Sequence, residues 1–286
     1  MHFDNPEFEN AYLGLLRANK ASNDRDSMLY DDLTNLENLA HDREYGLKLV
    51  QQTPLKKLLG LLHYAGDTEK RQKAARIIGS SLQNNPESLG TVRGTGLIRE
   101  LLTILKEESN SAVKASLIFT LSAAVAGKDE AKEFFDANGS QFLRERFGKD
   151  GVEVQGKCAT FVEDVLSRHR LLSGVDEEIS QWSRTFQDFL QSRPLDITSE
   201  KVLAALMYGL SLALANCNRT LKREAGDVCH TQNNFIAWLA DNVVAGGHGE
   251  VMDELLREAR HKVFGNPKAA RKAGWELEER PTKDEL

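Results

Sequence analysis

The stretch RQKAARIIGSSL, residues 71–82, carries its apolar residues mostly three and four positions apart and is the clearest indication of how this chain folds. Such spacing places the apolar side chains on one face of an α-helix. The same pattern recurs in five further stretches, 31–39, 113–125, 158–166, 202–214 and 235–244. Strand-like alternation is scarce and the chain has only 6 prolines. The sequence therefore predicts an all-α protein.

The predicted helices recur with a period near 43 residues. Lys114 and Lys157 begin equivalent helices 43 residues apart, and Lys201 begins another 44 residues later. The turns keep this period, since Gly96 and Gly139 are also 43 residues apart, and glycine is expected there to close one helix and open the next. This period falls in the armadillo/HEAT range, in which stacked units form a right-handed superhelix with a concave surface. We predict an armadillo/HEAT-like superhelical solenoid.

The pattern also predicts the domain organisation. Residues 1–29 are expected to be weakly ordered or partly helical, 30–264 to form the repeat domain with a C-terminal helical cap, and 265–286 to form a charged tail. Within the repeat domain we predict units at 30–65, 66–107, 108–149, 150–193 and 194–244.

The composition narrows the classes of function. The 286 residues have a formal net charge of −6, which argues against nucleic-acid binding because such binding normally needs a basic face. The longest uncharged apolar stretch, 202–215, is too short to cross a bilayer. We therefore expect neither a nucleic-acid partner nor membrane insertion.

The sequence shows no recognisable catalytic or metal-binding motif. There is no HExxH, GxSxG or Walker loop, and the 7 histidines are scattered. Cys158, Cys217 and Cys229 form no CxxC pair, and Cys229 adjoins His230 without zinc-ligand spacing. Cys217 and Cys229 flank one polar connection, so they are either bridged or free. We expect no catalytic residue, no metal and no cofactor, and hence a binding protein.

The C-terminus points to a compartment. The last four residues, Lys283-Asp284-Glu285-Leu286, match the signal that a receptor reads to retain proteins in the endoplasmic reticulum, so we expect a location in its lumen. The N-terminus has neither the basic nor the apolar stretch of a signal peptide, and we expect one upstream in the native gene. Asn138 and Asn218 begin sequons and are glycosylation candidates.

The repeats also predict where a partner binds. In armadillo units the last helix of each repeat lines the concave face, and here those helices span 71–84, 113–126, 154–168 and 200–216. Their outward positions, Arg76 among them, carry charges of both signs, which together suit a polar protein surface, although each single charge taken alone favours a solvated face. The expected contacts lie near the groove centre, with one histidine at its end: Lys114, Phe119, Lys157, Glu163 and Arg168, and His41.

Two stretches resemble a known family. LENLAHD at 36–42, followed by Tyr45-Gly46, resembles the first-repeat motif of the armadillo-like nucleotide exchange factors of heat-shock chaperones, the Fes, HspBP and Sil-one family. RQKAARIIGSSLQNNP at 71–86 resembles the most distinctive stretch of that family, and Val113-Lys114-Ala115 resembles the start of its next repeat helix. The resemblance covers roughly residues 30–170. The retention signal then favours the luminal, Sil-one branch.

The resemblance implies a nucleotide exchange factor for the luminal chaperone BiP. Such proteins wrap one lobe of the chaperone ATPase domain with the concave face and rotate it away from the other lobe, so that ADP leaves. The N-terminal extension is short here and lacks cysteine, so no redox role of that region carries over, and the C-terminal third matches no family motif. The alternative is a luminal armadillo scaffold that binds clients or cofactors without exchange activity.

Overall fold

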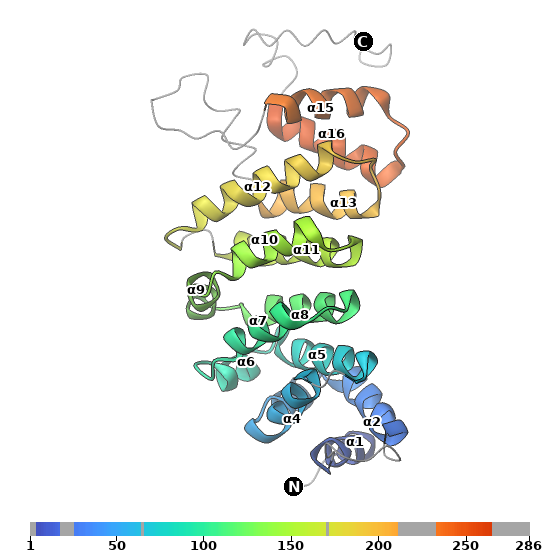
Figure 1. Cartoon of the computed structure of the whole chain (residues 1–286), viewed down its shortest axis with the longest axis vertical. Helices are drawn as coiled ribbons and strands as arrows, with labels where there is room; N and C mark the ends of the chain where they lie inside the picture. The colour runs from blue at the N-terminus through green and yellow to red at the C-terminus, as the bar shows by residue number, and fades with distance from the viewer. Residues whose placement is uncertain (1–3, 18–25, 64–65, 170–171, 211–232, 265–286) are drawn as a thin grey trace. The chain divides into compact units, whose positions relative to one another are not determined.

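The computed structural model describes residues 4–17, 26–63, 66–169, 172–210 and 233–264. Every regular element in these ranges is a helix, which confirms the all-α prediction (Figure 1). The chain divides into two compact units, Met1–Val175 and Asp176–Leu286.

The first unit is built from three-helix groups that follow two N-terminal helices. Its helices are α1 (Pro6–Arg17), α2 (Asp26–Leu39), α3 (Arg43–Leu49), α4 (Gln52–His63), α5 (Thr68–Leu82), α6 (Pro86–Val92), α7 (Leu97–Glu107), α8 (Ser111–Ala124), α9 (Lys128–Asp136), α10 (Gly139–Lys149) and α11 (Val152–Arg168). The groups are α3–α5, α6–α8 and α9–α11, and in each the first helix is the shortest and the last the longest. They begin at Arg43, Pro86 and Lys128, so the structure confirms the predicted period.

Capping residues show the same period. Asp42 and Asn85 cap α3 and α6 through side-chain oxygens that accept from backbone N–H groups of the first turn. Asp67 and Asn110 do the same for α5 and α8. Each cap satisfies donors that the helix itself leaves unpaired, at about 1 kcal/mol per cap. The sequence thus fixes the start of each helix locally, before any packing.

The turn before α10 differs from the prediction by one residue. Gly96 has a φ of 79° before α7, but the matching left-handed residue before α10 is Asn138, with a φ of 56°, rather than Gly139. Asparagine tolerates this conformation better than most residues. Gly139 is small for another reason, because a Cβ there would lie 2.3 Å from the Phe134 ring.

The core of the first unit runs between its third helices. α5 packs on α8, and α8 on α11, through side chains that are almost fully buried, among them Ile78, Leu117, Leu121 and Val162. Thr120 of α8 donates from its hydroxyl to the Ala75 carbonyl oxygen of α5 at 2.6 Å. This cross-helix bond and the apolar contacts fix the spacing of the two helices.

The N-terminal helix α1 packs on α2 and α4. Phe8 is fully buried, and its ring stacks on that of Tyr45 in α3 at a centroid distance of 4.3 Å. The N-terminal segment therefore contributes an ordered helix to the first unit over residues 6–17.

The second unit contains α12 (Val175–Gln191), α13 (Ile197–Ala204), η2 (Ala205–Gly209), α15 (Asn233–Ala245) and α16 (Glu250–Phe264). We expected one helix over 200–216, but the α-helix ends at Ala204 and continues as a π-helical turn. The amide of Leu210 bonds the Ala205 carbonyl oxygen at 3.0 Å, five residues back, as a π turn requires. Residues 211–216 lie outside the described ranges.

In the part of the chain that the structure describes, no helix has the length and apolarity needed to span a membrane. The same residues hold no cluster of three or more histidine, cysteine or acidic side chains suited to a metal ion.

Candidate binding face

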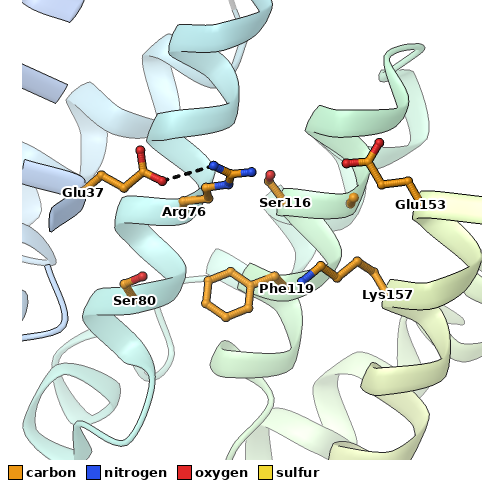
Figure 2. Close-up of a pocket in the computed structure, with 8 residues that line it drawn as sticks. Glu37, Arg76, Ser80, Ser116, Phe119, Glu153 and Lys157 are labelled. Atoms are coloured by element: carbon orange, nitrogen blue, oxygen red, sulfur yellow. Dashed lines mark hydrogen bonds and ion pairs between the residues drawn. The ribbon is translucent and has the colours of Figure 1, made fainter. Parts of the chain in front are cut away.

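The candidate site is a pocket of about 390 Å³ on the face that α2, α5, α8 and α11 share in the first unit. Helices α5, α8 and α11 are the last of their three-helix groups, so the predicted binding face is also where the structure is hollowed. The pocket is lined by Glu37, Arg76, Ser80, Ala115, Ser116, Phe119, Glu153 and Lys157 (Figure 2).

One wall of the pocket is an ion-pair cluster between α2 and α5. The Glu37 carboxylate lies 3.3 Å from Nη1 of Arg76 and 3.1 Å from Nζ of Lys73. Lys73 also lies over the ring of Tyr30, with its Nζ 5.0 Å from the ring centroid. The single acid thus contacts two cations, and the cluster leaves part of the Arg76 guanidinium exposed.

The opposite wall combines an aromatic ring with a lysine. Phe119 of α8 is half-buried, and Lys157 of α11 places its Nζ 5.7 Å from the ring centroid, a cation–π arrangement that Figure 2 shows reaching across from one helix to the other. Glu153, one turn before Lys157, is exposed. The pocket therefore offers two exposed cations, one exposed carboxylate and an aromatic surface.

The Phe119 ring is positioned by Gly79 of α5. A Cβ at Gly79 would lie 2.6 Å from Cε1 of Phe119 and 3.2 Å from Cα of Thr120. Such distances leave no room for a side chain, so glycine lets the ring lie against the backbone of α5.

Lys114, which we expected at the groove centre, is buried with a side chain only 6% exposed. Its Nζ lies 2.8 Å from Oδ1 of Asp150, just before α11, and the residue does not line the pocket. One repeat earlier Arg71 makes the same kind of contact with Glu108, just before α8. Both pairs join the beginnings of successive third helices.

Lys157 occupies the next position in that series, since 71, 114 and 157 are each 43 residues apart. It is exposed, and no carboxylate of the first unit's described residues lies within ion-pairing distance of it. The same repeat position thus holds a cation paired with an acid of the next repeat in α5 and α8, and a surface cation in α11.

The other expected contacts lie outside this pocket. Glu163 is half-buried on α11, where burial, and then the neighbouring Asp164, raises its pKa. Arg168 is exposed at the last residue of α11, and His41 is exposed in the turn between α2 and α3. The structure therefore brings together only Phe119 and Lys157 of the expected set.

Sequence reasoning missed several lining residues, although their spacing carried a signal. Ser80 follows Glu37 by 43 residues, and Phe119 follows Arg76 by the same interval. Residues one period apart face the same side of a stacked array, so this spacing predicts a common wall. Ser116 and Glu153 are lining residues without such a repeat partner in the pocket.

The remaining candidates are the glycosylation sites, the cysteines and the retention signal, and only some of them lie in the described ranges. Asn138 is exposed, whereas Ser140 of its sequon is buried and accepts a hydrogen bond from Arg144. Cys158 is a free, fully buried thiol, and burial raises its pKa. Three sets of expectations lie outside the described ranges: Asn218, the pair Cys217 and Cys229, and the retention signal Lys283-Asp284-Glu285-Leu286.

The fold defines an armadillo-like repeat protein with a pocket on the last helices of its repeats. Solved structures agree on the fold. An engineered protein superposes with a TM-score of 0.62 at 18% identity, covering 92% of this chain and 100% of its own. A designed armadillo repeat protein in complex with the peptide (KR)4 superposes with a TM-score of 0.56 at 14% identity, covering 96% and 99%.

The sequence comparisons are more specific. The family model described as "Nucleotide exchange factor SIL1" matches residues 4–279, and this chain belongs to that family. The "Nucleotide exchange factor SIL1" of Candida albicans is 28% identical over 84% of this chain and 60% of its own length. That of Xenopus laevis is 24% identical over 64% of this chain and 40% of its own length. The chain thus spans about 60% or less of these two relatives.

Proposed function

We propose that this chain is a nucleotide exchange factor for the luminal heat-shock chaperone BiP. In this proposal the face formed by α2, α5, α8 and α11 binds the chaperone ATPase domain and promotes release of ADP. The observation that carries the proposal is the match of the SIL1 family along residues 4–279.

The mechanism needs binding energy and no reacting group. If the face binds the open arrangement of the ATPase lobes more tightly than the closed one, it shifts the population toward the open state. A hundredfold faster release requires only about 2.7 kcal/mol of such differential binding. A few polar contacts around one aromatic anchor can supply that energy, so we propose a binding protein and not an enzyme.

Within this proposal the expected contact residues have different roles. Phe119 and Lys157 meet the partner directly, because both are accessible in the pocket. Lys114 acts indirectly, because its bond to Asp150 holds the start of α8 to the start of α11. Glu163, Arg168 and His41 contribute at the edges of the face.

We further propose that the chain resides in the lumen of the endoplasmic reticulum, where Asn138 and Asn218 are its glycosylation candidates, and is retained through Lys283-Asp284-Glu285-Leu286 by the receptor for that signal. Removing those four residues from the protein expressed with a signal peptide should lead to its secretion. Unchanged retention would count against this location.

The exchange activity is tested by following labelled ADP on the purified luminal chaperone with and without the chain. We expect clearly faster release with the chain, and the same acceleration with Lys132→Glu, a control at an exposed residue of α9 away from the pocket. Binding without faster release would favour the scaffold alternative. If the chain neither binds the chaperone nor accelerates ADP release, the proposed function is wrong.

A further inference from the structure

The strongest unexplained feature of the pocket is the ammonium group of Lys157. The equivalent basic residues one and two repeats earlier, Lys114 and Arg71, each contact an acid that precedes the next third helix. Lys157 contacts no acid among the described residues of the first unit, and its Nζ lies instead over the face of the Phe119 ring. Its charge is therefore available to a molecule that enters the pocket.

The charges around the pocket favour an anionic occupant. The carboxylate of Glu37 is already in contact with two cations, Lys73 and Arg76, so its charge is locally offset. Glu153 is the other acid in the lining, so with Lys73, Arg76 and Lys157 the charges around the pocket sum to a net positive value. The accessible cations of the lining, Arg76 and Lys157, face the same pocket of about 390 Å³.

The aromatic ring adds a second requirement. Phe119 is half-buried against Gly79, so part of its apolar ring remains accessible in the pocket. A group that meets the ammonium and this ring together must carry negative charge next to aliphatic carbon. Aspartate and glutamate side chains have this combination.

We propose that the pocket receives an aspartate or glutamate side chain of the protein partner, whose carboxylate contacts Nζ of Lys157 while its methylene groups pack on Phe119. This inference rests on the proposed function, since the partner is taken to be the chaperone ATPase domain. The incoming acid gives Lys157 a carboxylate partner, as Glu108 and Asp150 do for the basic residues of the two earlier repeats. The repeat position whose basic residue links helices within the chain in α5 and α8 thus contacts the partner in α11.

The proposal is tested by titrating the isolated luminal chaperone ATPase domain with the full chain, by calorimetry, at low and high salt. Lys157→Met keeps the aliphatic stem over Phe119 and removes the charge, so we expect binding to weaken about three- to tenfold and to depend less on salt. Lys157→Glu should weaken it by roughly tenfold or more, because like charges then meet. Lys157→Arg should restore most of the affinity.

Two matched variants complete the experiment. Lys132→Glu makes the same charge reversal on α9 and should leave the affinity within about twofold. Glu153→Gln removes the exposed acid of the pocket and should leave binding unchanged or slightly tighter.

The outcomes separate the two levels of the proposal. If the unaltered chain does not bind the ATPase domain, the proposed function fails and this inference falls with it. If the chain binds and Lys157→Met and Lys157→Glu bind equally well, the acidic occupant is wrong while the proposed function stands. Weaker binding by Glu153→Gln with no effect of Lys157→Met would overturn the proposal in favour of a basic occupant.

Discussion

Lys114 and Lys157 lie at the same position in α8 and α11, yet their surroundings are opposite. Lys114 is buried against Asp150, with a side chain 6% exposed, whereas Lys157 is exposed over the ring of Phe119. The backbone period is the same for both, so it does not decide their roles. What distinguishes Lys114 within the first unit is its ion pair with Asp150, 36 positions further along the chain.

The difference teaches how a repeat array gains a binding site. A buried cation is tolerated only with a counter-charge, since its desolvation is otherwise costly. Where the junction supplies an acid, the basic residue becomes part of the scaffold. Where no acid of the same unit pairs with it, the basic residue remains at the surface and can meet another molecule.

The largest expected effect is a difference in stability between the variants of Lys114 and Lys157. Lys114→Met leaves the Asp150 carboxylate, whose side chain is only 13% exposed, with Arg146 as its remaining cation at 3.9 Å, and should lower the free energy of unfolding by about 2–4 kcal/mol. Lys157→Met, at an exposed residue, should change it by less than about 0.5 kcal/mol. Denaturant unfolding of both variants measures the difference. Equal costs would show that the two lysines are energetically alike.

A smaller loss of stability is expected when the contact between Gly79 and the Phe119 ring is disturbed. Gly79→Ala puts a methyl group where the ring now lies, so the ring must move or α5 and α8 must separate. We expect a loss of about 1–3 kcal/mol in the free energy of unfolding and a shift in the amide signals near Lys157. Gly148→Ala, at a helical glycine with open space around its Cβ position, is the matched control and should not be destabilising. An unchanged spectrum for Gly79→Ala would contradict the assigned role of this glycine.

The smallest expected effect concerns a basic side chain that is buried and paired with a carbonyl group instead of an acid. Nε2 of His169 lies 3.2 Å from the Val125 carbonyl oxygen, so its N–H donates, and burial lowers the pKa of the imidazole. The unfolded chain, with a pKa near about 6.5, then binds more protons than the folded chain at mildly acid pH. Stability should be fully present above that value and fall as pH drops below it toward the folded pKa.

His169→Gln tests this dependence, because glutamine does not titrate. Its free energy of unfolding should be lower by about 1–2 kcal/mol at pH 7.5 and should decline less between roughly pH 7 and pH 5.5. His41→Gln, at an exposed histidine, should leave the slope of the original protein. A slope that survives in His169→Gln would assign the dependence to another group.

Much of the fold was predictable from the sequence because it is encoded locally. Capping residues such as Asp67 and Asn110 and the apolar spacing within α5 and α8 specify helices without reference to the rest of the chain. The π turn at Ala205–Gly209 was not predicted, since the apolar pattern of residues 202–214 suits either helix type. A π turn adds one residue to a helical turn. Whether the helix accepts it depends on packing against neighbouring helices, which a single sequence does not display.

The binding face was less predictable, because exposure depends on contacts between distant residues. Lys114 and Lys157 look alike in sequence, and only the contact with Asp150 separates them. Glu37 joins the pocket through cations of α5, and nothing near it in sequence indicates this. The expected contact residues stay a prediction until binding is measured.

The buried thiol of Cys158 allows local opening around α11 to be measured by chemical modification. Its Sγ lies 3.8 Å from the Leu143 carbonyl oxygen, the side chain is inaccessible to water, and burial raises its pKa, so the reactive thiolate is suppressed in the folded protein. An alkylating reagent can therefore modify this cysteine only when the packing around α11 opens transiently. Mass spectrometry of the peptide that contains Cys158 would time those openings, and would tell whether a bound partner makes them rarer.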